Sequence, residues 1–340
     1  MIVSGDTAGW IMPCGCTANQ SGGLPRRGTF VNRARADHHM IVADVGGAPG
    51  GTSPYDRLKF EAILAGELAM GVTAHNLGSP EAALGADYLR ETGKRLGVPF
   101  LSANLRDQKG VLIGVPSIAA MGSPSGKRVL LVGVVSPRLV PRGFKADEPR
   151  DAILAALKGA PEYDALVVLA YLREPELRQL AAELPEADVV VGGPTGQSIA
   201  PVRLGPTWLA SATNKGKFLI QLDSEGRSEP WAGQVVELSP ALPDDPVQAR
   251  NLDRFHAELA QRDFAADQTG FMSGLAPGVP ADYRVAGTQA CRTCHRDDCD
   301  LWDRSKHALA WRTLEARGLQ VDPQCQTCHT TGYGLPGGFQ

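Results

Sequence analysis

Four of the seven cysteines stand in two copies of one short pattern near the end of the chain. Each copy is Cys-x-x-Cys-His, at Cys291, Cys294 and His295 and again at Cys325, Cys328 and His329. Two thiols at this spacing can add to the two vinyl groups of one porphyrin, and the adjacent histidine then ligates the iron. Paired Cys-x-x-Cys motifs also form zinc sites from four thiolates. A histidine directly after both motifs favours two covalent c-type haems.

Cys14 and Cys16 form a second kind of pair, in the run Pro-Cys-Gly-Cys. Two thiols separated by one glycine could form a strained, easily reduced disulfide, or could bind one soft metal ion, since thiolate is a soft ligand. The alternative is a pair of buried structural cysteines. Arg26 and Arg27 could lower the pKa of a thiol or hold an anionic substrate, or could be solvated loop charges. Cys299 lies outside every motif, and we expect a free thiol near the surface.

The composition restricts what the chain around these motifs can be. Its 340 residues suggest two domains, at about 150 residues each. The 34 Lys and Arg residues nearly balance the 37 Asp and Glu residues and are scattered along the sequence, which argues against binding to nucleic acid. Apolar runs such as Val129–Val135 are much shorter than a bilayer span, so we expect no membrane span.

From residue 39 to 223, short apolar runs alternate with longer amphipathic ones, which predicts an α/β domain. The predicted strands are His39–Val45, Thr73–Leu77, Phe100–Asn104, Val129–Val135, Ala165–Leu172, Val189–Gly192, Trp208–Ala212 and Phe218–Leu222. The predicted helices are Asp56–Met70, Pro80–Leu96, Pro149–Leu157 and Pro175–Leu184, followed by a longer helix over Pro246–Asp267 that should pack back on the sheet. We place the domains at 1–268 and 287–340, with a Gly- and Pro-rich linker over 269–286.

The second domain resembles the multihaem cytochromes related to the tetrahaem electron carrier of nitrifying bacteria. The resemblance rests on both haem motifs, on the run from Trp302 to Ala310, and on the glycine-rich run after His329. It implies a small, mainly helical module in which His307 is a distal axial ligand, although His307 could also be an exposed helix residue. Spacing does not tell which haem His307 would ligate. Related domains continue with further haem motifs, so we expect a haem-bearing partner or a missing C-terminal segment.

Residues 1–225 resemble the 5′-nucleotidase branch of the calcineurin-type metallophosphoesterases, which implies a four-layer α/β/β/α sandwich. The matching segments are Gly22 to Arg27, Leu101 to Asn104 and Lys215 to Lys217. The metal-binding motifs of that family are largely lost: the positions read Asp6-Thr-Ala8-Gly9, Gly46-Gly47, Gly78-Ser79-Pro80-Glu81, Tyr171 and Gly193-Pro194-Thr195-Gly196. Of the usual ligands only Asp6 remains, as a vestige.

A two-metal centre needs several carboxylate and imidazole ligands at once, and one aspartate cannot supply them. We therefore expect that hydrolysis is lost. His38, His39 and His75 match no ligand position of the family and are expected to be ordinary surface or strand-end residues.

The order of the domains and the Pro-Cys-Gly-Cys loop further resemble a cytochrome-linked, UshA-like branch of this family that includes selenoproteins. If selenium can replace sulfur at Cys14 or Cys16, that atom is a redox nucleophile or a metal ligand. The resemblance therefore makes these two cysteines the candidate catalytic residues of the large domain.

Together these patterns predict an extracytoplasmic redox protein, because bacteria attach c-type haem outside the cytoplasm. In the leading hypothesis, the haems exchange electrons with the Cys14/Cys16 loop on a hydrolytically inactive fold, and the partners are redox proteins or other cytochromes. One alternative is a pure electron carrier whose large domain is a docking scaffold. Another is a surviving phosphoesterase with an altered metal site that uses Asp6, Glu81 and the thiols.

Overall fold

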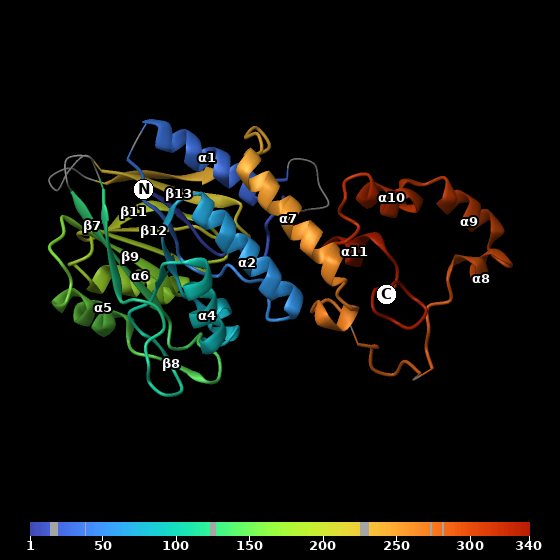
Figure 1. The fold of residues 1–340 in the computed structure, drawn as a ribbon, viewed down its shortest axis with the longest axis horizontal. Helices are drawn as coiled ribbons and strands as arrows, with labels where there is room; N and C mark the ends of the chain where they lie inside the picture. The colour runs from blue at the N-terminus through green and yellow to red at the C-terminus, as the bar shows by residue number, and fades with distance from the viewer. Residues whose placement is uncertain (14–19, 38, 123–126, 225–230, 273, 281) are drawn as a thin grey trace. The chain divides into compact units, whose positions relative to one another are not determined.

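The computed structural model describes the chain except for residues 14–19, 38, 123–126, 225–230, 273 and 281 (Figure 1). The predicted Cys14/Cys16 loop and His38 lie outside the described residues. The chain forms two compact units, one made of residues 1–51 and 59–251, the other of residues 52–58 and 252–340.

Two six-stranded sheets form the centre of the first unit. The first sheet has the strand order β14-β13-β1-β2-β3-β4, in which β1 to β4 run parallel and the β13–β14 pair lies antiparallel at one edge. Its strands are β1 (Ile2–Ser4), β2 (Val42–Asp44), β3 (Val72–Asn76), β4 (Phe100–Leu101), β13 (Phe218–Asp223) and β14 (Ala232–Glu237).

The second sheet has the order β11-β12-β10-β9-β7-β6, with a parallel centre and antiparallel edge strands. Its strands are β6 (Ser117–Met121), β7 (Arg128–Val135), β9 (Ala165–Tyr171), β10 (Val189–Gly193), β11 (Ile199–Leu204) and β12 (Thr207–Ser211). A short antiparallel pair, β5 (Leu105–Asp107) and β8 (Phe144–Ala146), is separate from both sheets.

Buried aliphatic side chains join these layers. One core cluster combines residues of the two sheets, among them Val3, Val45, Leu131, Val167 and Val191. The other packs the second sheet against α5 (Pro149–Lys158) and α6 (Glu174–Glu183), the green helices of Figure 1. The expected four-layer α/β/β/α sandwich is therefore confirmed, because each central strand buries both of its faces.

The remaining helices of the first unit are α1 (Leu24–Asp37), α2 (Pro54–Ala69), α3 (Ser79–Ala83) and α4 (Ala86–Leu96). The helix α7 (Pro246–Arg262) begins against α2, where Gln248 and Asn251 donate to the carbonyls of Gly66 and Ala62 at 2.9 and 2.8 Å. The first turn of α2 and the later part of α7 belong to the second unit.

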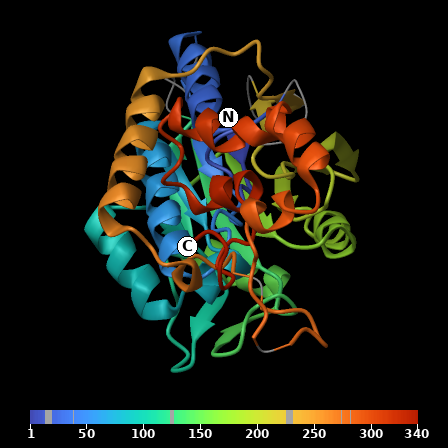
Figure 2. The same ribbon diagram turned by 90° about the vertical axis from the view of Figure 1, so that its right-hand side faces the viewer.

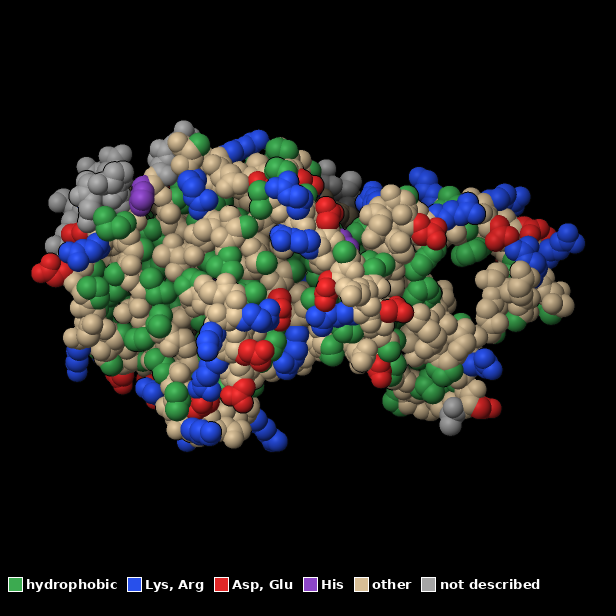
Figure 3. All heavy atoms as spheres, viewed as in Figure 1, with side chains coloured by type: hydrophobic (Ala, Val, Ile, Leu, Met, Phe, Trp, Pro, Cys, Tyr) green, Lys and Arg blue, Asp and Glu red, His purple; other side chains and the backbone are tan. Residues whose placement is uncertain are grey.

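The second unit otherwise consists of short helices, drawn in orange and red in Figure 2. They are η1 (Ala266–Gln268), α8 (Thr288–Arg292), α9 (Arg296–Asp303), η2 (Lys306–Leu309), α10 (Ala310–Glu315) and α11 (Pro323–His329). Among the described residues, no helix is long and apolar enough to cross a bilayer. On the face in Figure 3, basic and acidic side chains are interspersed, as the scattered charges of the sequence led us to expect.

Candidate haem sites and the phosphoesterase edge

The helix α11 positions the second haem motif. Asp322 caps this helix, since its carboxylate accepts the N–H of Gln324 at 2.9 Å, and Pro323 occupies the first turn. Cys325 and Cys328 are three residues apart, so they lie on one face of the helix. The motif therefore presents both thiols in the same direction, as attachment to one porphyrin requires.

The ring of His329 is oriented by a backbone carbonyl. Its Nδ1 lies 2.9 Å from the carbonyl oxygen of Ala310. Because a carbonyl only accepts hydrogen bonds, Nδ1 must donate, which leaves the lone pair of the neutral ring on Nε2. Iron-ligating histidines are commonly held in this way by a second group on the far nitrogen. His329 and its two cysteines thus fit a c-type haem.

The first haem motif begins in α8 and ends at the start of α9. Cys291 and Cys294 are exposed and free, and the Nδ1 of His295 lies 3.3 Å from a carboxylate oxygen of Asp298. Arg292, inside the motif, pairs at 2.7 Å with Asp300 on α9. Here too Nδ1 faces an acceptor, which leaves Nε2 available to iron.

His307 and Cys299 lie in the short helices between the two motifs. His307 is exposed in the short helix η2, as both interpretations of it allowed. Cys299 is free but buried, at 7% exposure on α9, so the expected position near the surface was wrong. The reason is that α9 turns this small apolar side chain inward, as free cysteines often are.

In the first unit, several of the positions compared above with the family's metal motifs lie at the carboxyl ends of the parallel strands. Asp6 follows β1, Gly46 and Gly47 follow β2, and Gly78 follows β3, while Tyr171 ends β9 of the second sheet. The topology therefore brings together positions that are widely separated in the sequence.

The ring of Tyr171 fills the centre of this edge. A Cβ atom added to Gly47 would lie 2.9 Å from the ring, and one added to Gly78 would lie 2.6 Å from it. The ring is buried, and burial, followed by the negative charges of Glu81 and Asp6, raises the pKa of its hydroxyl. Tyr171 is therefore neutral, and its ring fits here because Gly47 and Gly78 have no side chains.

Glu81 is turned away from solvent onto backbone donors. Its fully buried carboxylate accepts the N–H groups of Gly47, Ala48 and Gly78 at 3.1, 2.7 and 2.9 Å. A carboxylate oxygen of Glu81 also lies 3.5 Å from Nε2 of His75. The backbone hydrogen bonds fix the two glycine loops against each other.

Asp6 is held in a similar way. Its Oδ2 accepts the hydroxyl of Thr213 at 2.6 Å and the N–H of Asn214 at 3.2 Å. Burial raises the pKa of Asp6, although these two hydrogen bonds act in the opposite direction. One carboxylate oxygen of Asp6 is thus engaged by protein donors.

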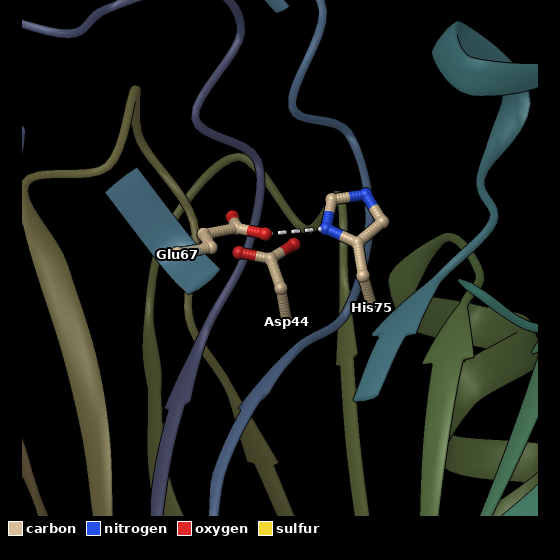
Figure 4. A group of neighbouring side chains, drawn as sticks. All are labelled: Asp44, Glu67 and His75. Carbon is tan, nitrogen blue, oxygen red and sulfur yellow. Dashed lines mark hydrogen bonds and ion pairs between the residues drawn. The ribbon is translucent and has the colours of Figure 1, made fainter. Parts of the chain in front are cut away.

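A buried charged cluster that the sequence did not reveal lies beneath this edge. We call Arg27, Asp44, Glu67 and His75 the Arg27 cluster; three of its members appear in Figure 4. His75 donates from Nδ1 to Glu67 at 2.7 Å, and a guanidinium nitrogen of Arg27 lies 3.8 Å from Asp44 and 3.7 Å from Glu67. All four side chains are almost fully buried. Arg27 is therefore not a solvated loop charge, which was one of its two interpretations. His75 lies near the end of β3, as expected, but it is buried rather than at the surface.

The carboxylates of Asp44 and Glu67 and the ring of His75 offer donor atoms within 4.8 Å of one another, as a metal site would. The cluster nevertheless contains its own cations. Burial alone would lower the pKa of His75, but the charge of Glu67 and the hydrogen bonds from Glu67 and Glu81 raise it well above the ordinary value. Arg27 and protonated His75 lie among three buried carboxylates, those of Asp44, Glu67 and Glu81, so we interpret the cluster as structural.

Replacing Glu67 by Ala should lower the free energy of unfolding by about 3–5 kcal/mol, because it leaves His75 and Arg27 buried without their carboxylate. The matched control is Glu61→Ala on the same helix. Glu61 pairs with Arg95 at 2.7 Å but is partly exposed, so its loss should cost about 0–1 kcal/mol. Urea unfolding of both variants measures the difference. An equal loss of unfolding free energy in the two variants would show that the Arg27 cluster does not stabilise the fold.

The raised pKa of His75 also predicts a pH dependence of stability. The folded protein keeps a proton that the unfolded chain releases above about pH 6.5. The stabilisation is complete below that pH and is lost as the pH rises through the folded-state pKa of His75. Unfolding free energies from pH 6 to 9 should fall in the wild type and fall less in His75→Asn. Parallel curves for the two proteins would contradict this assignment.

Comparison with known proteins separates the same two regions. Residues 290–340 match the family model described as cytochrome c554 and c-prime. No curated protein matches the chain. Among solved structures, the 5′-nucleotidase precursor of Thermus thermophilus is 19% identical with a TM-score of 0.64, over 78% of this chain and 59% of the other.

Two further structures are similar. The sulfate thiohydrolase SoxB of Thermus thermophilus is 20% identical, with a TM-score of 0.61 over 71% of this chain and 48% of its own. The calcineurin-like phosphoesterase YfkN of Bacillus subtilis is 15% identical, with a TM-score of 0.59 over 76% of this chain and 96% of its own. This chain thus spans about half to three fifths of the first two proteins. The large unit has the fold of the calcineurin-like phosphoesterases and 5′-nucleotidases, and the C-terminal segment matches the cytochrome c554 family.

Proposed function

We propose that the protein is an extracytoplasmic c-type cytochrome that transfers electrons through two covalent haems. The observation that carries the proposal is the second motif within the cytochrome c554 match: the carbonyl of Ala310 fixes Nδ1 of His329 and leaves Nε2 for iron. The first motif has the same composition, and an acceptor faces Nδ1 of its histidine as well.

Each residue of these motifs has a defined task. The thiols of Cys291, Cys294, Cys325 and Cys328 attach the porphyrins, and His295 and His329 hold the irons. A bound haem supplies a one-electron carrier. The protein sets the orientation of each histidine through the group on its Nδ1, which for His329 is the Ala310 carbonyl and for His295 is the Asp298 carboxylate.

We further propose that the large unit no longer hydrolyses phosphoesters. Tyr171 occupies the space between Gly47 and Gly78, both oxygens of Glu81 accept backbone N–H groups, and Oδ2 of Asp6 accepts two protein donors. A dinuclear centre works by holding two cations close together with several ligands. What remains at this edge is a neutral phenol, two bonded carboxylates and glycine backbone, which do not make such a centre.

In this proposal, Cys14 and Cys16 are the redox-active or metal-binding atoms of the large unit, and they exchange electrons with the haems. The described residues before and after this segment lie close together, because Leu24, the first residue of α1, donates its N–H to the carbonyl of Ile11 at 2.9 Å. The partners are redox proteins or other cytochromes. If the thiols are structural instead, the large unit is a docking scaffold for a pure electron carrier.

A hydrolase assay tests the loss of phosphoesterase activity. The purified protein is given 5′-AMP and a phosphodiester substrate with Mn²⁺, Zn²⁺ or Mg²⁺, beside an Asp6→Ala variant. We expect only background rates from both proteins. Metal-dependent turnover that disappears in Asp6→Ala would restore the hydrolase interpretation.

His307 should ligate a haem other than the one on Cys325 and Cys328. Ala310 lies behind His329, on the ring edge away from iron, and His307 precedes it by only three residues. The segment of His307 therefore joins the Nδ1 side of the His329 ring, whereas Nε2 is the nitrogen that would hold the iron. In His307→Ala, one low-spin haem should become high-spin. A Cys291→Ala/Cys294→Ala variant carries only the haem on Cys325 and Cys328, and adding His307→Ala to it should leave the spin state of that haem unchanged. Visible and electron paramagnetic resonance spectra report this difference, and a fully unchanged spectrum would make His307 a surface residue.

A further inference from the structure

A buried tyrosine from a distant part of the sequence anchors the second haem motif. Tyr55 lies in the segment 52–58, which belongs to the second unit, and its side chain is 1% exposed. The hydroxyl donates to a carboxylate oxygen of Asp322 at 2.7 Å. The ring packs edge-on against Phe271, with 5.5 Å between the centroids, and near Phe255 at 6.3 Å. The aromatic packing fixes where the hydroxyl points.

Asp322 is equally buried, at 1% exposure. The oxygen that accepts from Tyr55 also accepts the N–H of Gln324 at 2.9 Å, and Nε2 of His256 lies 3.9 Å from the other oxygen. The carbonyl of Asp322 accepts the N–H of Cys325 at 2.9 Å. Tyr55, Gln324 and His256 therefore lie around this carboxylate, and the backbone carbonyl of Asp322 is hydrogen-bonded to Cys325.

The Tyr55–Asp322 pair lies close to the site of haem attachment. Burial raises the pKa of Tyr55 well above its ordinary value, and the charge of Asp322, their hydrogen bond and the charge of Cys325 add to the effect. Asp322 connects Tyr55 with Cys325, because its carboxylate accepts the hydroxyl of Tyr55 at 2.7 Å and its carbonyl accepts the N–H of Cys325 at 2.9 Å. The carboxylate of Asp322 is thus held in the interior, next to the motif that would carry the second haem, rather than in solvent.

We propose that Asp322 sets the reduction potential of the haem on Cys325 and Cys328, and that Tyr55 tunes this effect. The inference rests on the proposed haem function and adds a positioning role for two residues outside the motif. Ferric haem carries one more positive charge than ferrous haem, so a buried carboxylate nearby stabilises the oxidised form. The charge therefore lowers the potential, and the hydrogen bond from Tyr55 weakens its influence by drawing electron density from the carboxylate.

Redox titration of the full chain with both haems, followed by visible absorbance, tests the proposal. Asp322→Asn keeps the size and an oxygen acceptor for the cap but removes the charge. We expect the reduction equilibrium constant of one haem to rise about tenfold, which is about 59 mV for a one-electron couple. A Cys291→Ala/Cys294→Ala variant, which retains only the second haem, assigns the shifted potential. The matched control is Asp253→Asn, an exposed residue of α7 that should leave both potentials unchanged.

Tyr55→Phe gives a second and opposite signature. It removes the hydroxyl donor but keeps the ring, so the negative charge of Asp322 is less compensated. The reduction potential of the haem on Cys325 and Cys328 should therefore fall. This variant decides the question if Asp322→Asn loses its second haem. Unchanged potentials in Tyr55→Phe and in fully loaded Asp322→Asn would make Asp322 a helix cap only. The haem content of the wild type is measured first, from its pyridine haemochrome spectrum. A wild-type chain without haem would refute the proposed function. Variants that bind haem but show unshifted potentials would refute only this inference.

Discussion

Replacing both Cys325 and Cys328 by Ala should halve the covalent haem content of the mature protein. Each Cys-x-x-Cys-His motif attaches one porphyrin through its two thiols, so a motif without thiols retains none. Cys291→Ala/Cys294→Ala should also leave one haem, and the variant without all four thiols should leave none. The pyridine haemochrome, divided by the polypeptide concentration, measures the content after maturation in a bacterial periplasm.

The chain supplies its own control for this experiment. Cys299 is a free, buried thiol on α9, between the two motifs, and Cys299→Ala should keep both haems. If the removal of one motif abolishes both haems while the protein stays folded, the motifs do not act separately. If it removes none, the thiols serve another purpose, such as a four-thiolate zinc site.

Replacing Cys14 or Cys16 by Ser should abolish reduction of the haems by the physiological substrate. A hydroxyl neither exchanges with disulfides nor binds soft metals as a thiolate does, so the electron path from the large unit ends there. The haem spectra and the reduction of the haems by dithionite should remain unchanged, because the C-terminal motifs are intact. Stopped-flow absorbance with the substrate and then with dithionite separates the two effects.

The double Ser variant decides between the two electron-transfer hypotheses. Full reduction of its haems by the physiological donor would make the protein a plain electron carrier. The thiols would then be structural, and the large unit would act as a docking scaffold. Cys299→Ala again serves as the control, since it removes a thiol that belongs to neither proposed site.

Much of the fold followed from apolar patterning, and the exceptions have physical reasons. All eight expected strands form, because buried parallel strands such as Arg128–Val135 and Ala165–Tyr171 are nearly continuous apolar runs. The expected helix Pro80–Leu96 is interrupted at Gly85, whose φ of 100° ends one helix before the next begins.

The missed elements lacked such a pattern. The helix α1 contains a glycine and four arginines, a composition without a clear apolar stripe. Its buried face includes Arg27, whose charge is compensated only by residues that are distant in the sequence. The edge strands β6, β11 and β14 were also missed, because none of their residues is fully buried.

Among the sites, local sequence motifs could be predicted, whereas clusters formed by distant residues could not. The two Cys-x-x-Cys-His motifs are local in sequence, so they could be proposed as haem sites from spacing alone. The Arg27 cluster could not, because its members come from two helices and two strands and meet only through the parallel pairing that sets Asp44 opposite His75. The one available signal was a polar residue inside each of two buried strands, Asp44 in β2 and His75 in β3. The contact of Tyr55 with Asp322 gave no sequence signal.

The intact mass of the chain after periplasmic maturation tests the central claim most directly. The account predicts a species that carries the mass of two haems beyond the polypeptide and keeps it in denaturing solvent, because thioether bonds survive unfolding. A polypeptide mass without added porphyrin, or one that gains only zinc under native conditions, would contradict it.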